Sequence, residues 1–267
     1  MDKEPPKHVL EKTHRPRCPT TFVTEYFKIP SKHSNEQYIQ WIKNLKNLCL
    51  IIFTDSPALW NITDQVLIKT TICAEGRALN KSQSFWRQQW YQDPEASIHK
   101  SYQLYLTWNL KPYFMSQAVN MNPFASDYFF WIDAGYMRTP KLGDARSLIP
   151  PVDNSAVHFL LVGQFTPPEL SGNFHYTVSQ DRIGGGMFGG HASTIAPWSR
   201  LYYRMLQEYV DRGWFVGKDQ NIMATLCAEQ PAACVLLDPR VWFWQSPWFA
   251  MWDCLLRQRD CTVRPIR

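Results

Sequence analysis

Residues 20–55, TTFVTEYFKIPSKHSNEQYIQWIKNLKNLCLIIFTD, contain the pattern from which we predict the fold. Residues 20–27 (TTFVTEYF) are β-branched and aromatic, which is typical of a strand. From Ser34 onward apolar residues recur at helical spacing, and serine is a favoured residue at a helix N-terminus. Residues 49–55 (CLIIFTD) predict a buried strand that ends in a carboxylate. A strand, a helix and a strand of this length predict a parallel crossover unit.

The same alternation of strands and helices continues through most of the chain. It predicts an α/β protein with a mostly parallel sheet flanked by helices, whose ligands collect at the carboxyl ends of the strands. Pro94 and Pro112 are expected to divide or kink the long helical region. The further expected strands are 65–72, 127–133, 157–162 and 234–238, and the expected helical regions are 82–119, 197–212 and 218–229.

The composition favours a folded protein and excludes several classes of protein. Of the 267 residues 45% are apolar and 15% aromatic, which excludes disorder over most of the length. The net charge of +5 is too small to indicate a nucleic-acid partner. The longest apolar run has six residues, whereas a membrane helix needs about 20, so we expect no transmembrane segment.

We divide the chain into a flexible N-terminal arm (residues 1–19), one domain (20–256) and a basic C-terminal tail (257–267). The arm is rich in charge and proline and has no apolar stretch of signal-peptide length. We therefore expect a cytoplasmic protein, and the alternative is a secretory lumen if an N-terminal anchor was trimmed.

The seven cysteines are an odd number at spacings that suggest no metal site. Without a CxxC pair or a Cys/His cluster, zinc is not expected. Cys49 and Cys234 lie within apolar runs, so we expect them to act as small buried hydrophobic residues.

Asp133 is the first candidate for chemistry, in the segment WIDAG (residues 131–135). A carboxylate that follows a buried strand lies at the ligand edge of the sheet, where it can reach a metal or a ribose. Gly135 would let the backbone approach a ligand closely. The alternative is that Asp133 only caps the next turn. Asp55 closes the strand at 49–55 in the same way and is expected near a nucleobase or ribose.

Residues 184–190 (GGGMFGG) hold five glycines in seven positions, which is atypical of a helix or an ordinary strand. This composition predicts a loop that wraps round a ligand, and the alternative is a flexible or tightly turning loop. No Gly-Lys-Ser/Thr ending follows, so the segment is not a phosphate-binding P-loop. His191 comes next, and it is a candidate base, ligand or hydrogen-bonding loop residue.

Two residues on expected helices complete the candidates. Asp219 begins an apolar helix, where it could cap the helix or, near a ligand, act as a base or bind an acceptor hydroxyl. Lys111 lies on the helix before Asp133 and could reach a diphosphate. The alternative for Lys111 is a solvated surface position.

In their order along the chain, six segments resemble the HtrL/YibB and WlaTC-like proteins, which are grouped with glycosyltransferases of the GT-A fold. The resemblance covers residues 20–243 and implies a Rossmann-like GT-A domain. It also implies a hexosyl- or pentosyltransferase, which moves a sugar from a nucleotide-sugar donor, a UDP-sugar, to a hydroxyl of a glycan or small molecule. The six segments are TTFVTEYF, IIFTD, LYLTWNLKPYF, NPFASDYFFWIDAGYMR, GGGMFGGH and GKDQNIM.

The same resemblance implies a role for each candidate residue. Asp133 would take the place of the usual Asp-x-Asp motif, and the glycine segment resembles the FGG loops that line the donor sugar and the acceptor. Asp219 resembles the acidic residue that touches the reacting sugar or serves as base. Donor-binding roles are implied for Asp55, Lys111, Asp133, Gly135, Gly189 and Gly190, and catalytic roles are considered for Asp219 and His191.

A divalent metal, Mn²⁺ or Mg²⁺, is implied as well, with Asp133 as its ligand. Together with Lys111 it would stabilise the charge on the leaving nucleoside diphosphate. The motif here is Asp-Ala-Gly, so the second carboxylate is absent, and no histidine follows His191. Either Asp133 binds the metal with help from His191 or water, or transfer needs no metal.

The rival function is a catalytically inactive nucleotide- or carbohydrate-binding protein on the same fold. The missing second carboxylate keeps this alternative open. A hydrolase is not expected, because no Gly-x-Ser-x-Gly motif is present. If transfer inverts the configuration of the sugar, Asp219 is expected as the base, and if transfer retains it, as the group that stabilises an oxocarbenium-like centre.

Overall fold

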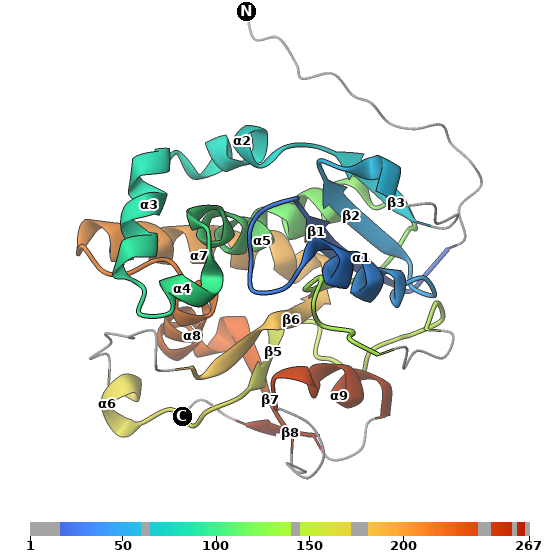
Figure 1. The fold of residues 1–267 in the computed structure, drawn as a ribbon. Coiled ribbons are helices and arrows are strands. Elements are labelled where there is room, and N and C mark those ends of the chain that lie inside the picture. Colours follow the sequence, from blue (N-terminus) through green and yellow to red (C-terminus); the bar gives the residue numbers. More distant parts are fainter. Residues whose placement is uncertain are drawn as a thin grey trace, which may run out of the picture.

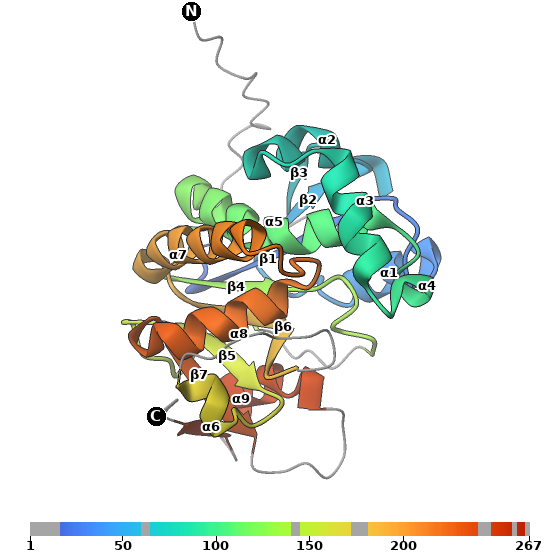
Figure 2. The same ribbon diagram turned by 90° about the vertical axis from the view of Figure 1, so that its left-hand side faces the viewer.

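The computed structural model describes residues 17–59, 65–139, 145–171, 181–239, 247–257 and 261–264. Within them the strands form one eight-stranded sheet, in the order β3-β2-β1-β4-β6-β5-β7-β8 (Figures 1 and 2). Parallel pairs join β1 to β2 and β4, β2 to β3, and β5 to β7, which confirms the predicted α/β class with a mostly parallel sheet. The strands are β1 (Thr20–Tyr26), β2 (Leu50–Thr54), β3 (Val66–Lys69), β4 (Tyr128–Ile132), β5 (Val157–Leu161), β6 (Ile183–His191), β7 (Cys234–Pro239) and β8 (Cys261–Arg264).

Helices cover both faces of the sheet and bury a hydrophobic core on each (Figure 2). On one face lie α5, α7 and α8, whose buried side chains include Phe114 and Tyr202. On the other face lie α1 and α9, with Ile42 and Met251. No helix in the described part of the chain is long and apolar enough to cross a membrane. The helices are α1 (Asn35–Lys43), α2 (Ile72–Glu75), α3 (Gln83–Gln92), α4 (Ala96–His99), α5 (Tyr102–Met121), α6 (Pro167–Leu170), α7 (Ala192–Asp211), α8 (Asp219–Glu229) and α9 (Met251–Arg257).

The predicted crossover unit is present as β1, α1 and β2. Ser34 caps α1, because its hydroxyl accepts a hydrogen bond from the Gln37 amide at 3.3 Å. The Gln37 side chain accepts one in return from the Ser34 amide at 3.0 Å, which completes a capping box. The local sequence therefore determines where this helix begins.

The glycine-rich segment is a strand, and the predicted loop is wrong. β6 runs antiparallel between β4 and β5, and Gly189 lies opposite Phe130. A Cβ atom on Gly189 would lie 2.6 Å from the Phe130 Cα and would collide with the carbonyl oxygen of Phe129. The close approach of two strand backbones, rather than a ligand, requires glycine at this position.

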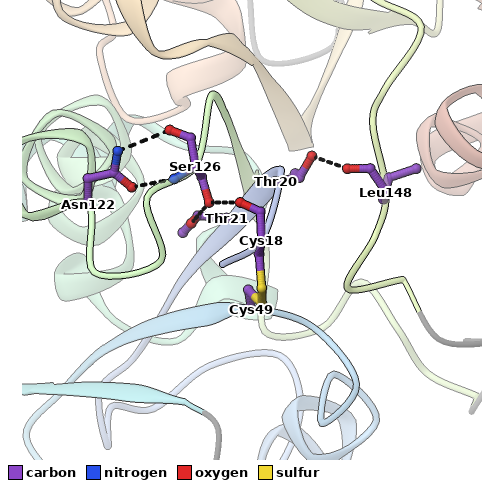
Figure 3. The surroundings of a disulfide bond; sticks show 7 residues. All are labelled: Cys18, Thr20, Thr21, Cys49, Asn122, Ser126 and Leu148. Atoms are coloured by element: carbon purple, nitrogen blue, oxygen red, sulfur yellow. Dashed lines mark hydrogen bonds between the residues drawn. A yellow bond between two sulfur atoms is a disulfide. The ribbon is translucent and has the colours of Figure 1, made fainter. Parts of the chain in front are cut away.

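Six of the seven cysteines form disulfides. Cys49 and Cys234 are buried as predicted, but they are disulfide partners rather than free hydrophobic side chains. Cys18 pairs with Cys49, and the carbonyl oxygen of Cys18 accepts a hydrogen bond from Ser126 at 2.6 Å (Figure 3). This bridge joins the segments that lead into β1 and β2. The other pairs are Cys227–Cys234 and Cys254–Cys261, and Cys73 is free and exposed.

Pro94 separates α3 from α4 as expected, whereas Pro112 lies inside α5, which continues on both sides of it. Two expectations about the ends of the domain differ from the structure. In the interval assigned to a basic tail, Cys261–Arg264 forms β8 at the edge of the sheet, where Arg264 contacts Asp238 at 2.8 Å. At the other end Cys18, assigned to the arm, is fully buried, while residues 1–16 lie outside the described residues.

Candidate functional site

A cavity of about 440 Å³ lies at the carboxyl ends of β1 and β4. Residues 25–27, from the end of β1, and 133–136, which follow β4, both line it. The sheet continues from β1 to β2 and β3 on one side, and from β4 to β6 on the other. The strand order therefore reverses between β1 and β4, which is the place where open α/β sheets bind their ligands.

Three of the predicted residues meet in this cavity. The ammonium nitrogen of Lys111, on α5, lies 3.0 Å from Oδ1 of Asp133 and 2.9 Å from Oδ2 of Asp219. It also donates a hydrogen bond to the Gly185 carbonyl oxygen on β6 at 3.0 Å. A lysine has three N–H donors, and three acceptor oxygens surround the Lys111 ammonium at 2.9–3.0 Å.

Burial governs the electrostatics of this cluster. The side chains of Lys111 and Asp219 are only 3% and 5% exposed, whereas that of Asp133 is 37% exposed. Burial alone would lower the pKa of Lys111, but the charges of Asp133 and Asp219 outweigh it and raise that pKa above its usual value. Burial raises the pKa of Asp219, although Lys111 opposes the shift. The lysine thus neutralises a pair of carboxylates that would otherwise repel each other.

Two glycines near the start of β6, Gly185 and Gly186, border this cluster, so the strand contributes only backbone atoms there. A Cβ atom on Gly185 would lie 3.3 Å from Oδ2 of Asp219, and one on Gly186 would lie 3.4 Å from Oδ2 of Asp133. Glycine at these two positions lets the strand run against both carboxylates. Gly135, predicted to bind the donor, also lines the cavity.

Glu25 is a cavity residue that the sequence analysis missed. It lies on β1, and its Oε2 atom is buried without a hydrogen-bond partner among the described residues. Burial raises the pKa of Glu25 well above its usual value, and Lys111 only partly opposes the shift. The signal that could have identified Glu25 is a single carboxylate near the carboxyl end of a strand made otherwise of β-branched and aromatic residues.

The rim of the cavity is positively charged and aromatic. Lys32 and Arg138 both line it, and within the described residues neither has an acidic partner at salt-bridge distance. Burial, followed by the charges of Arg138 and Lys32, lowers the pKa of His33 beside them. The Arg138 guanidinium lies 5.1 Å from the ring centroids of both Trp41 and Phe249. Further aromatic residues that line the cavity are Tyr38, Trp108, Trp131 and Trp248.

The sequence analysis also missed a pair of residues, Asp93 and His99, of which His99 lines the same cavity. His99, the last residue of α4, lines it, and its Nδ1 atom lies 2.7 Å from Oδ2 of the buried Asp93. The same oxygen accepts a hydrogen bond from the Tyr105 hydroxyl at 2.6 Å. No local pattern pointed to these residues, because Asp93 and His99 lie on either side of Pro94 in a region read only as helical.

Four predicted site residues lie outside the cavity. Asp55 ends the β2 segment and accepts a hydrogen bond from Ser56 at 2.8 Å. Gly189 and Gly190 are buried in β6 against β4. His191 caps α7 and lies five residues beyond Gly186, about 17 Å along the strand. The structure therefore does not bring these four residues together with Asp133.

The residues present do not fit the implied divalent metal. Oδ1 of Asp133 already binds Lys111 and also accepts a hydrogen bond from the Trp131 indole at 2.6 Å. Asp219 faces the Lys111 ammonium, and position 135 is a glycine. The described part of the chain holds no group of three His, Cys, Asp or Glu side chains arranged for a metal. A buried lysine occupies the place between the carboxylates.

Comparison with known proteins gives a family match and matches among solved structures. The model of a family described as "Bacterial protein of unknown function (HtrL_YibB)" matches residues 67–254. Among solved structures, the apo form of mouse xyloside xylosyltransferase 1 matches with a TM-score of 0.44 and 11% identity, over 82% of this chain and 85% of that chain. No curated protein matches the sequence. We draw no functional argument from so distant a structural similarity.

Proposed function

The chain belongs to the HtrL/YibB family, and from this premise and the cavity geometry we propose that it is a glycosyltransferase. It transfers a sugar from a nucleotide-sugar donor, a UDP-sugar, to a hydroxyl group of a glycan or small-molecule acceptor. The observation that carries the proposal is the charged cluster of Lys111, Asp133 and Asp219 at the point where the strand order reverses. A positively charged, aromatic rim surrounds this cluster.

The rim suits the donor. A nucleoside diphosphate is an anion with a flat base, so it needs fixed cations and aromatic surface. Lys32 and Arg138 provide cations that no described acidic group neutralises. The indole and phenyl rings beside them provide the surface on which a base or a sugar face can pack. We therefore propose that Lys32 and Arg138 bind the diphosphate.

The carboxylates suit the reacting end of the donor. Asp133 is the more exposed of the two, so it can accept hydrogen bonds from the ribose or sugar hydroxyls. Asp219 lies deeper, and we assign to it the stabilisation of the positive charge that develops at the anomeric carbon. Lys111 positions both carboxylates rather than the diphosphate, since the two carboxylates and the Gly185 carbonyl oxygen already surround its ammonium.

The three disulfides support an oxidising compartment for this activity. Such bonds are rare in the cytosol, where thiols are kept reduced. We propose that the chain works in a secretory lumen or a comparable oxidising space, rather than in the cytoplasm.

The proposal is tested first by thermal shift with nucleoside diphosphates and UDP-sugars. A ligand that binds only the folded state raises the melting temperature by mass action. We expect UDP to raise it, Arg138→Ala to reduce the rise, and Arg204→Ala, at an exposed position of α7 away from the cavity, to leave it unchanged. UDP release from the stabilising UDP-sugar then measures turnover.

Each outcome distinguishes the two functions. Binding with turnover supports the transferase. Binding without turnover for any donor supports the inactive binding protein, which the tight ion pair between Lys111 and Asp219 favours, because that pair restricts the carboxylate. No shift with any nucleotide would contradict the transferase and would leave a carbohydrate-binding protein as the remaining alternative.

A further inference from the structure

The arrangement of Asp93 and His99 resembles a base and its orienting carboxylate. The Asp93 side chain is fully buried, and its pKa is lowered: burial acts to raise it, but hydrogen bonds from Tyr105, the Glu95 amide and His99 outweigh burial. Asp93 is therefore an anion at neutral pH and can only accept hydrogen bonds. The proton of this contact consequently lies on Nδ1 of His99, at 2.7 Å from Oδ2 of Asp93.

This tautomer leaves Nε2 of His99 with a lone pair. No described group forms a hydrogen bond to Nε2, and Nε2 is not among the buried unpartnered atoms. The imidazole is held in place by an edge-to-face contact with Trp108, with ring centroids 5.0 Å apart. His99 and Trp108 both line the cavity, so the oriented imidazole borders the proposed reaction space.

The structure also links His99 to the carboxylate cluster. Glu95, just before α4, contacts the Lys218 ammonium at 2.5 Å, and Lys218 directly precedes Asp219. On α5, Leu104, Thr107, Trp108 and Lys111 share the face that lines the cavity. The dyad and the cluster are therefore two walls of one cavity.

We propose that His99 is the catalytic base of this transferase and Asp93 its positioning residue, an assignment that rests on the proposed function. Nε2 of His99 takes the proton of the acceptor hydroxyl while the acceptor oxygen forms a bond to the anomeric carbon. The bond between that carbon and the diphosphate oxygen breaks, and its electron pair leaves with the nucleoside diphosphate. The imidazolium then returns its proton to water. Asp219 is less suited to this task, since its Oδ2 is held by Lys111.

The test uses two nucleophiles, because the natural acceptor need not be known. With water as acceptor, release of UDP from a UDP-sugar requires that a proton be removed, whereas azide forms a glycosyl azide without losing any proton. His99→Asn keeps an N–H donor for Asp93 but lacks Nε2. We expect it to lower the reaction with water by about 10²- to 10⁴-fold and to preserve the reaction with azide.

Two further variants complete the experiment. His191→Asn is the matched control, because His191 lies outside the cavity and asparagine is a good N-cap for α7. Asp93→Asn should lower the water reaction as His99→Asn does. His99→Ala should recover activity when free imidazole is added, which a purely structural role would not produce.

The outcomes separate this assignment from the function it rests on. If the wild-type protein neither binds UDP nor releases it from any UDP-sugar, the proposed function fails, and the assignment fails with it. If the wild-type protein releases UDP and His99→Asn does so equally fast, only the assignment is overturned. Equal loss of the water and azide reactions would overturn it too, because it indicates a structural defect.

Discussion

The ammonium of Lys111 lies 2.9 Å from the Asp219 carboxylate, and both side chains are almost completely buried. The two residues belong to α5 and α8, and Asp133 on the other side of the ammonium follows β4. Together Lys111, Asp219 and Asp133 therefore join three elements at the centre of the proposed site. It also makes the stability of the protein depend on the same residues as its activity.

Lys111→Met should destabilise the protein strongly, because it leaves two carboxylates without their buried partner. Loss of one member of a buried ion pair typically costs about 3–5 kcal/mol. The free energy of unfolding from urea denaturation measures the effect. Lys46→Met, at an exposed position, should change it by less than about 0.5 kcal/mol, and an equally small effect at Lys111 would contradict the ion pair.

Asp219→Asn should abolish sugar transfer but leave UDP binding intact. The amide has almost the same shape as the carboxylate, but it cannot stabilise positive charge at the anomeric carbon. UDP release and the UDP-dependent thermal shift measure the two effects separately. If transfer survives at the wild-type rate, Asp219 has no part in the reaction.

Manganese should not change the UDP-dependent thermal shift of the wild-type protein, because Lys111 already occupies the place between the carboxylates. The shift is compared in EDTA and in Mn²⁺ at equal UDP concentration. Asp133→Ala should weaken UDP-sugar binding under both conditions. A shift that grows with Mn²⁺ in the wild type and not in Asp133→Ala would show that Asp133 is a metal ligand after all.

Glu25→Gln should stabilise the protein at neutral pH. A carboxyl group whose pKa is raised by folding holds its proton in the native state while the unfolded chain has lost it. The native state then binds more protons, so stability falls as pH rises from the unfolded value of 4.5 through the raised folded pKa. Glu25→Gln has no ionisable group at this position, so its stability does not fall with pH in this way.

Urea denaturation at pH 4 and pH 8 tests the direction of this change in stability with pH. We expect Glu25→Gln to have the larger advantage over the wild type at pH 8, and little or none at pH 4. An advantage that is larger at pH 4 would show that Glu25 is ionised and stabilising in the folded protein.

The disulfides predict one reactive thiol in the folded, oxidised protein, that of Cys73. A thiol titration without reductant counts it, and seven titratable thiols would exclude all three bridges. Removal of the Cys18–Cys49 bridge by Cys49→Ala should lower the free energy of unfolding by about 2–4 kcal/mol. Cys73→Ala is the matched control, since its side chain is exposed and unpaired.

Local signals in the sequence were enough to predict most elements. The cap at Ser34 and the apolar runs of β1, β2 and β4 depend on neighbouring residues only, and they are present in the structure. The family resemblance assigned Asp133, Lys111 and Asp219 to one site, and the structure brings their side chains together, while the roles of these residues stay predictions.

Features that depend on distant residues were not predictable in this way. The glycines of β6 are typical of a loop when the sequence is considered locally. They are explained by the neighbouring backbone of β4, which leaves no room for a Cβ atom at Gly189. The bridge between Cys18 and Cys49 joins residues 31 positions apart, and nothing local marks the pair. Asp93 and His99 become a dyad only because Tyr105 and Trp108 hold them against the cavity.

The antiparallel course of β6 has a consequence for how the protein folds. It brings Gly185 against Lys111, while Glu25 and Asp219, close to opposite ends of the chain, line the same cavity. Contacts between such distant segments form late and slowly, because long loops must close first. Refolding should therefore restore helical circular dichroism well before it restores UDP binding. Recovery of UDP binding during refolding would then indicate that the whole sheet has formed.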